Sequence, residues 1–226
     1  MKKDYVRLVI SDTHLGSAHS KEKELYEFLS TVEYDEIVLA GDIVEFLRKP
    51  MFTDNTHRIF QNILDSGKKI VYIVGNHDDT LSSFVGKDLA GIDFRESYDF
   101  VYSGRKYRIQ HGDQYDNSIV KWRYTIELIS FFQNMIERVF GIDLTTWWAN
   151  RQIKKRQLKR IWDLVKWNED ADVFIMGHTH NPEVLIWVDK NEQIKTYINT
   201  GDWVGNCTYV LIKDKQVRLR KYDKLV

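Results

Sequence analysis

Acidic residues and histidines recur in five short motifs spaced along most of the chain. In sequence order these are SDTHLG, GDIVE, GNHD, HGD and GHTH, and they hold five of the seven histidines. Their candidate metal ligands are Asp12, His14, Asp42, Asn76, His111, His178 and His180. Imidazole nitrogens with carboxylate and amide oxygens, and no thiolate, suit manganese, iron, zinc or cobalt better than magnesium alone. The motifs therefore predict a divalent-metal site, and we expect manganese.

The GDIVE and GNHD motifs indicate what such a site does. Each carboxylate oxygen of Asp42 can hold a different cation, which places two cations roughly 3.5–4 Å apart. Two cations neutralise phosphoryl oxygens and lower the pKa of a bridging water toward neutrality, so that hydroxide forms at pH 7. We expect His77 to contact the phosphoryl group or protonate the leaving oxygen, and Asp78 to orient His77. The expected reaction is hydrolysis of a phosphate ester or pyrophosphate.

The elements that must position these motifs are strands. Each motif ends an apolar segment rich in β-branched residues: YVRLVISD, EIVLAGD, KIVYIVGNHD, KYRIQHGD and ADVFIMGHTH. Helical segments are expected at 20–31, with Ser20 as N-cap, and at 53–66, with Gly67 at its end. Ligands of open α/β sheets bind beyond the carboxyl ends of the strands, so we expect the motifs to converge there.

The pattern changes after residue 95 to paired strands with reversals at SGR and KDK, which predicts hairpins and a mixed sheet. The NTGDW segment, residues 199–203, is expected to form a further loop beside the metals. Residues 117–168 lack strand character and predict a helical insertion with a break near Gly141. We expect one domain, 1–226, with a helical lid at about 117–168.

The charge balance, the cysteine content and the hydrophobicity of the sequence indicate which partners and which cellular compartment to expect. Lys plus Arg equals Asp plus Glu at 33 each, so no overall field favours nucleic acid. The single cysteine, Cys207, and an N-terminus without a signal-peptide pattern indicate a cytoplasmic protein. The apolar runs are shorter than the roughly 20 residues of a membrane-spanning helix, but the aromatic content permits peripheral contact with the inner face of a membrane.

Taken in order, the five motifs resemble the signature of the calcineurin-like metallophosphoesterases over residues 12–180. The resemblance implies a layered α/β/β/α sandwich with mixed sheets and a helical cap. The implied ligand sets are Asp12, His14 and His180 on one metal, Asn76, His111 and His178 on the other, and Asp42 bridging both. His77 takes the place of the catalytic histidine. The third position after GD is usually Asp in the family and is Glu45 here, which leaves the role of Glu45 open.

A narrower resemblance links HGDQYD, the insertion and residues 181–212 to the UDP-2,3-diacylglucosamine hydrolases, which cleave the pyrophosphate of a lipid-bearing nucleotide sugar in lipid A synthesis. The best-known members have Arg where this sequence has His77. Residues 119–168 hold ten Lys or Arg, four Asp or Glu and five of the seven tryptophans. Such a lid would bind acyl chains and anionic phosphate or headgroups, unless its aromatics only pack it onto the body.

The substrate contacts expected at the base of the lid are Asp113, Gln114, Asp116, Asn117, Trp122 and Arg123, although several of these residues are equally typical of turns and helix caps. The leading hypothesis is a metal-dependent pyrophosphohydrolase of UDP-2,3-diacylglucosamine or a similar amphipathic nucleotide. One alternative is a phosphodiesterase or phosphomonoesterase for a soluble nucleotide or phosphoprotein. Another is a non-catalytic metal-containing scaffold, against which His77 and the full ligand set argue. A nuclease is disfavoured because the sequence shows no stacking sheet or second capping domain.

Overall fold

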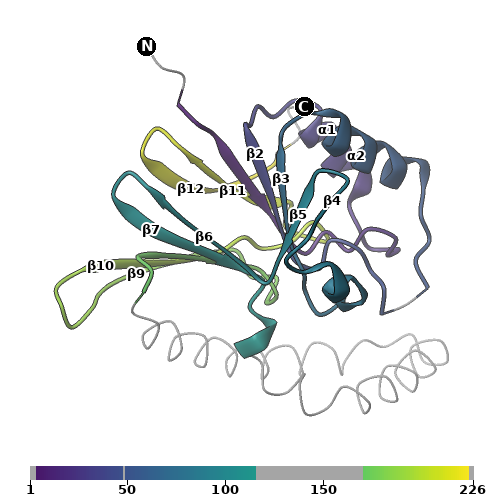
Figure 1. Cartoon of the computed structure of the whole chain (residues 1–226). Helices are drawn as coiled ribbons and strands as arrows, with labels where there is room; N and C mark the ends of the chain where they lie inside the picture. Colours follow the sequence, from purple (N-terminus) through teal and green to yellow (C-terminus); the bar gives the residue numbers. More distant parts are fainter. Residues whose placement is uncertain (1–3, 48, 116–169, 224–226) are drawn as a thin grey trace, which may run out of the picture. The chain divides into compact units, whose positions relative to one another are not determined.

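Two mixed β-sheets form the core of the chain in a computed structural model that describes residues 4–47, 49–115 and 170–223 (Figure 1). The first sheet has the order β12-β11-β1-β2-β3-β5-β4. Its strands are β1 (Arg7–Ile10), β2 (Glu36–Ala40), β3 (Lys69–Ile73), β4 (Asp88–Leu89), β5 (Ile92–Arg95), β11 (Thr208–Lys213) and β12 (Gln216–Lys221). The second sheet has the order β6-β7-β8-β10-β9. Its strands are β6 (Ser97–Tyr102), β7 (Arg105–Gln110), β8 (Val173–Met176), β9 (Glu183–Val188) and β10 (Ile194–Asn199).

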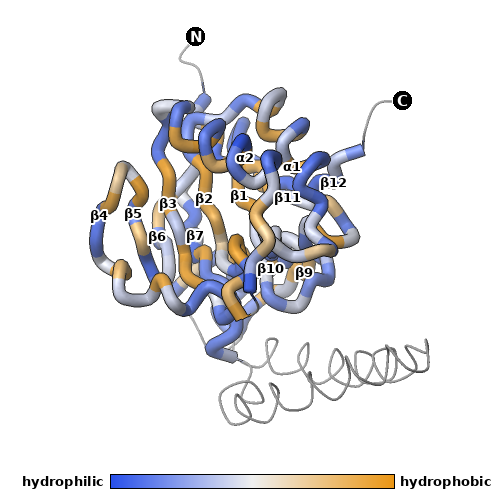
Figure 2. The backbone as a smooth tube through the Cα atoms, turned by 90° about the vertical axis from the view of Figure 1, so that its right-hand side faces the viewer, coloured by the Kyte–Doolittle hydropathy of each residue, from blue (hydrophilic) through white to orange (hydrophobic). Residues whose placement is uncertain are grey.

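The central strands of the first sheet are buried on both faces, which explains their continuous apolar sequences. Along β1, Leu8 and Ile10 pack with the helices α1 (Glu22–Leu29) and α2 (Asp54–Asp65), whereas Val9 faces the second sheet. Figure 2 shows hydrophobic residues concentrated along these strands. The parallel pairs β1–β2, β2–β3 and β3–β5 all lie in this sheet, so the chain leaves several strands at one edge.

Local signals explain most of the element boundaries. Thr53 caps α2, because its side chain accepts from Asn55 N and Thr56 N in a capping box. The expected cap of the first helix is wrong: Lys21 is the N-cap, and Ser20 Oγ donates instead to Thr13 O at 2.7 Å. Both residues at the β11–β12 reversal, Asp214 and Lys215, have left-handed φ, as in the tight turns of hairpins.

The expectation of an α/β fold with two mixed sheets is confirmed. The β4–β5 hairpin was not predicted, because its strands are too short to show a periodic pattern. The chain divides into two compact units, and the second, Gly112–Asn168, includes the expected insertion. Residues 117–168 lie outside the described residues, so the lid and the fourth layer of the expected sandwich stay predictions. No described helix combines the length and the apolarity needed to cross a bilayer.

A buried ion cluster joins three strands at the end of the sheet opposite to the motifs. Arg7, Glu36 and Lys69 are cross-strand neighbours on β1, β2 and β3. Glu36 is fully buried and pairs with Arg7 through Nε and with Lys69 Nζ at 3.0 Å. The Arg7 guanidinium also lies 4.0 Å from the Phe100 ring centroid, which belongs to the other sheet. The cluster therefore holds the three strands in register and ties them to β6.

Replacing Glu36 with Ala should lower the free energy of unfolding by about 3 kcal/mol, because the partly buried guanidinium of Arg7 loses its counter-charge. The cost lies at the lower end of the range for buried pairs since Lys69 reaches solvent. Urea denaturation measures it, with Glu33→Ala at an exposed position as the control. Equal midpoints for the two variants would show that the cluster contributes nothing.

Candidate metal centre

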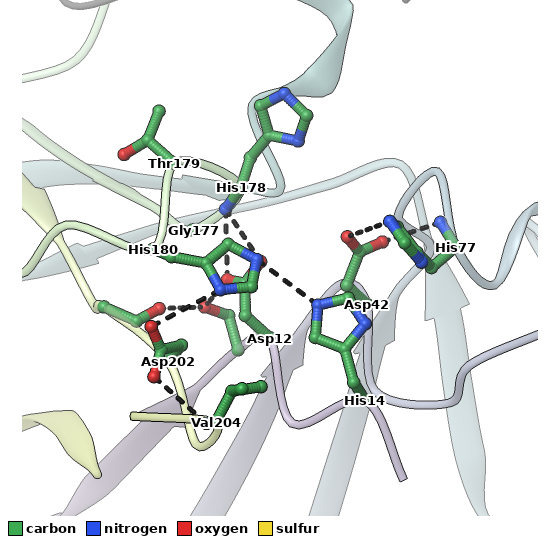
Figure 3. A network of polar contacts seen from close by, with 12 residues as sticks. Asp12, His14, Asp42, His77, Gly177, His178, Thr179, His180, Asp202 and Val204 are labelled. Atoms are coloured by element: carbon green, nitrogen blue, oxygen red, sulfur yellow. Dashed lines mark hydrogen bonds and ion pairs between the residues drawn. The ribbon is translucent and has the colours of Figure 1, made fainter. Parts of the chain in front are cut away.

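Three of the predicted ligands lie together where β1 and β8 end (Figure 3). The ligand atoms of Asp12, His14 and His180 are all within 4.8 Å of one another. His180 Nε2 is 3.3 Å from His14 Nε2 and 3.3 Å from Asp12 Oδ1. Asp12 comes from the loop after β1 and His180 from the loop after β8, so strands of both sheets contribute. We refer to these three residues as the first ligand group.

Four other residues form a second ligand group: Asp42, Asn76, His111 and His178. Asn76 Oδ1 is 3.2 Å from His111 Nε2 and 3.1 Å from His178 Nδ1. Asp42 Oδ2 lies 3.2 Å from the same Nε2 of His111. Burial alone would raise the pKa of the Asp42 carboxyl, but its interactions with His111, His77 and His14 hold this pKa well below its usual value. The expected convergence of distant motifs is therefore present in the fold.

The chemistry of the second group fits a divalent cation. His111 Nδ1 lies 3.1 Å from Ala40 O, and since a carbonyl only accepts, Nδ1 carries the proton. In the neutral ring Nε2 then presents a lone pair toward oxygens of Asp42 and Asn76. Three electron-rich atoms that face one another repel unless a cation lies among them, and nitrogen and oxygen donors suit manganese, iron or zinc. The residues therefore fit the metals that the sequence predicts.

The loops that carry the ligands have an unusual backbone. Asp12, His14, Asp42, His178 and His180 all have left-handed φ, between 44° and 66°. This region is sparsely populated by residues other than glycine and persists only where surrounding contacts fix it. Here the hydrogen bonds Asp12 N to Gly41 O and His14 N to Asp42 O, both 3.0 Å, continue the β1–β2 pairing into the loops. His178 N also donates to both carboxylate oxygens of Asp12, at 3.1 and 3.0 Å.

Glycines permit this close packing at several positions. A Cβ on Gly41, whose φ is +85°, would overlap the His111 ring. A Cβ on Gly177 would overlap both Asp12 Oδ2 and Ser11 Oγ. Gly41 thus allows the close approach of the His111 ring, and Gly177 allows that of the Asp12 carboxylate.

Glu45 is the orienting residue that sequence reasoning left without a role. Its Oε2 is 2.8 Å from His77 Nδ1 and 3.2 Å from His14 Nδ1. Burial raises the pKa of Glu45, but the hydrogen bonds with His14 and His77 outweigh it and hold the pKa at about 2. Burial lowers the pKa of His77, yet acceptance by Glu45 and the charge of Asp42 leave it above its ordinary value. One carboxylate oxygen thus contacts the predicted catalytic ring and a predicted ligand.

The expectation that Asp78 orients His77 is wrong. The fully buried Asp78 carboxylate accepts from Ile43 N at 2.8 Å, Tyr72 OH at 2.6 Å and Gly75 N at 2.5 Å. Burial and the neighbouring Asp42 raise the pKa of Asp78 to about 6. Asp78 therefore ties the loop after β2 to the loop after β3, and the His77 ring pairs with Glu45 instead.

Asp202 is a further site residue, which the sequence placed only within the NTGDW loop. Its Oδ2 lies 3.4 Å from His180 Nδ1. Burial lowers the pKa of His180, but Asp12 and Asp202 raise it to about 8. The available signal was a further GD sequence close to the end of a strand, as in GDIVE and HGD.

The predicted substrate contacts fall in the second compact unit. Asp113 and Gln114 belong to the short 3-10 helix η2 (Asp113–Tyr115), where Gln114 Oε1 accepts from Gly112 N at 3.2 Å. The others, Asp116, Asn117, Trp122 and Arg123, lie outside the described residues. All six stay predictions.

A cluster of imidazole, carboxylate and amide ligands at the loop edge of a mixed α/β sandwich is typical of metal-dependent hydrolases. A family model described as calcineurin-like phosphoesterase matches residues 6–182. The chain belongs to this family, and it is a metal-dependent hydrolase.

Individual relatives agree with this assignment. UDP-2,3-diacylglucosamine hydrolase from Tolumonas auensis is 23% identical, with 94% of this chain and 95% of the relative covered. The protein of the same name from Porphyromonas gingivalis is 27% identical, with 89% and 91% covered. Among solved structures, an archaeal phosphodiesterase aligns with a TM-score of 0.50 at 14% identity, covering 95% of this chain and 98% of that one. The structural likeness supports the fold alone.

Replacing Glu45 with Gln should lower kcat for hydrolysis of a phosphodiester with an alkyl leaving group by about 10–100-fold, the usual effect of losing a carboxylate that orients a site histidine. The negative charge that holds the protonated form of His77 is lost, and one amide oxygen replaces the acceptor shared by two rings. Steady-state kinetics at saturating Mn²⁺ measures the change. Glu192→Gln, in an exposed turn, is the control; indistinguishable rates for the two variants would exclude an orienting role.

Proposed function

We propose that this protein hydrolyses the pyrophosphate bond of UDP-2,3-diacylglucosamine, or of a similar amphipathic nucleotide, at a centre of two divalent metal ions, with manganese the preferred ion. The observation that carries the proposal is the pair of ligand groups at one sheet edge, with Asp42 beside both. The names of the relatives, which match over most of their length, support the substrate.

Each ligand has a proposed place. Asp12, His14 and His180 would hold one cation, Asn76, His111 and His178 the other, and Asp42 would bridge them. The proximity of Asp42 to both groups is supported by its 3.2 Å contact with His111 and its charge interaction with His14. When bound, the two ions supply a nucleophilic hydroxide near neutral pH and neutralise charge on the phosphoryl oxygens. The left-handed loops would set the ligand directions before any ion binds.

His77 would act as the general acid. Its Nδ1 is engaged by Glu45, which directs Nε2 into the site at 3.9 Å from Asp42 Oδ2. The pKa of His77 is raised above its ordinary value, which favours the protonated ring, and that proton can be given to the leaving oxygen. The backbone of the same residue donates to Asp42 Oδ1 at 2.8 Å, so His77 N also positions the proposed bridging carboxylate.

Residues 117–168 would form the lid over the substrate. Their excess of cations suits the nucleotide phosphates, and their tryptophans suit acyl chains or a membrane surface. Asp113, Gln114, Asp116, Asn117, Trp122 and Arg123 are the proposed contacts at its base. The proposed location is the cytoplasm, with peripheral contact at the inner face of the membrane. A purely structural metal scaffold would not require the His77–Glu45 pair, which favours catalysis.

The first test compares Mn²⁺-loaded wild type with Asp42→Asn on UDP-2,3-diacylglucosamine in detergent, following UMP and lipid phosphate. We expect metal-dependent cleavage by the wild type and a loss of at least about 100-fold in the variant, because one carboxylate charge next to both cations is removed. Metal-dependent hydrolysis of an aryl phosphodiester without cleavage of the lipid nucleotide would keep the mechanism and reject the substrate.

A second test concerns the proton donor. His77→Asn should lower kcat by about 100–10,000-fold for a diester with an alkyl leaving group, because that oxygen must be protonated as it departs. The loss should be far smaller for a nitrophenyl leaving group, which departs as a stable anion. The backbone N–H of residue 77 can still donate to Asp42 in this variant, so metal binding should be unchanged. The measured metal content therefore serves as an internal control. If kcat falls equally for both leaving groups, His77 does not act as the proton donor.

A further inference from the structure

The loop between β10 and β11 is organised around one buried carboxylate. Asp202, 5% exposed, accepts through Oδ1 from the backbone of Val204 at 3.0 Å, Gly205 at 2.7 Å and Asn206 at 2.9 Å. Three consecutive N–H groups on one oxygen fix the turn and leave the second oxygen, Oδ2, to make other contacts. The direction of Oδ2 is therefore set by the fold of the loop.

Asp202 Oδ2 and the Asn206 amide hold His180 at two points. Asp202 Oδ2 lies 3.4 Å from His180 Nδ1 (Figure 3). Asn206 Nδ2 donates to the same carboxylate oxygen at 2.9 Å. Asn206 Nδ2 also donates to the carbonyl of His180 at 2.9 Å. The ring and the backbone of His180 are thus positioned together. With its proton on Nδ1, the ring turns Nε2 toward Asp12 and His14.

The same loop supports Asp12. The side chain of Trp203 is fully buried, with its ring 5.1 Å from Phe28, and its backbone N donates to Asp12 O at 3.0 Å. Thr200 Oγ1 is 2.5 Å from Ser11 Oγ, which in turn donates to Asp12 Oδ2. These contacts all support Asp12, a member of the first ligand group. By contrast, His111 of the second group is oriented by Ala40 O, a backbone carbonyl on β2.

We infer that Asp202 and Asn206 form a clamp that sets the affinity of the cation held by Asp12, His14 and His180, and that leaves the other cation position unchanged. The inference rests on the proposed two-metal function. An anionic acceptor on one ring nitrogen makes the other a stronger donor and fixes its direction, and loss of such a partner lowers metal affinity by about 10–100-fold. Asp202 is a positioning residue, since it acts through the ring of His180.

The test is Mn²⁺ binding to metal-stripped wild type and Asp202→Asn, followed by calorimetry and by the electron paramagnetic resonance of unbound Mn²⁺. Asparagine keeps an oxygen for the three backbone N–H groups, so the loop can retain its turn. We expect two equivalents for the wild type. In the variant one equivalent should be unchanged and the other weakened by about 10–100-fold, with recovery at high Mn²⁺. Asn206→Ala, which keeps the carboxylate, should weaken the same equivalent less.

Asp189→Asn is the matched control, because Asp189 Oδ1 makes the same kind of turn with Asn191 N at 2.8 Å and Gln193 N at 2.9 Å between β9 and β10. Both equivalents should be unchanged there. Thermal unfolding of the metal-free variants checks that they fold. Fewer than two equivalents in the wild type would overturn the two-metal proposal. Two equivalents in the wild type, with both retained or both equally weakened in Asp202→Asn, would overturn the clamp alone.

Discussion

The burial of carboxylates at one edge of the sandwich is the constraint on which the rest of the site depends. Five carboxylates are buried there, and an unpaired charge in such a place is strongly unfavourable; they belong to Asp12, Asp42, Glu45, Asp78 and Asp202. Each is compensated by backbone N–H groups, by a hydroxyl or by an imidazole. The left-handed turns exist because these partners can be brought to the oxygens only by a tightly folded backbone.

The buried carboxylates at the two ends of β1, β2 and β3 have different partners. At one end the charge of Glu36 is matched within the chain by Arg7 and Lys69. At the other end, the described ion pairs of Asp12, Asp42, Glu45 and Asp202 are all with histidines, which carry a full charge only when protonated. The first arrangement is complete as a structural support. The second matches its carboxylates with imidazoles, which in their neutral form offer a nitrogen lone pair to a cation.

The sequence predicts the convergence of the motifs well, because parallel strands deliver their carboxyl ends to one edge whatever the loops do. It does not predict which acid faces which histidine. Glu45 meets a ring 32 positions away and Asp202 one 22 positions away, contacts that depend on loop conformation. Asp78 was expected to orient its neighbour His77, but a residue adjacent in sequence points elsewhere once Tyr72 and two backbone N–H groups compete for it. Ser20 does not cap the first helix for a similar reason, because its hydroxyl donates to the carbonyl of Thr13.

The place of β1 in the sheet has a consequence for how the protein is made. β1 lies between β2 and β11, and the backbone of Trp203 binds Asp12. A chain that grows from its N-terminus therefore exposes one unpaired edge of β1 until β11 has been synthesised, and an open apolar edge is prone to pair with other chains. A chain that ends before β11 would already contain every proposed ligand and Asp202, but it would lack the strand that covers this edge of β1. Closure of the strand that leads to Asp12 is therefore a late event in biosynthesis.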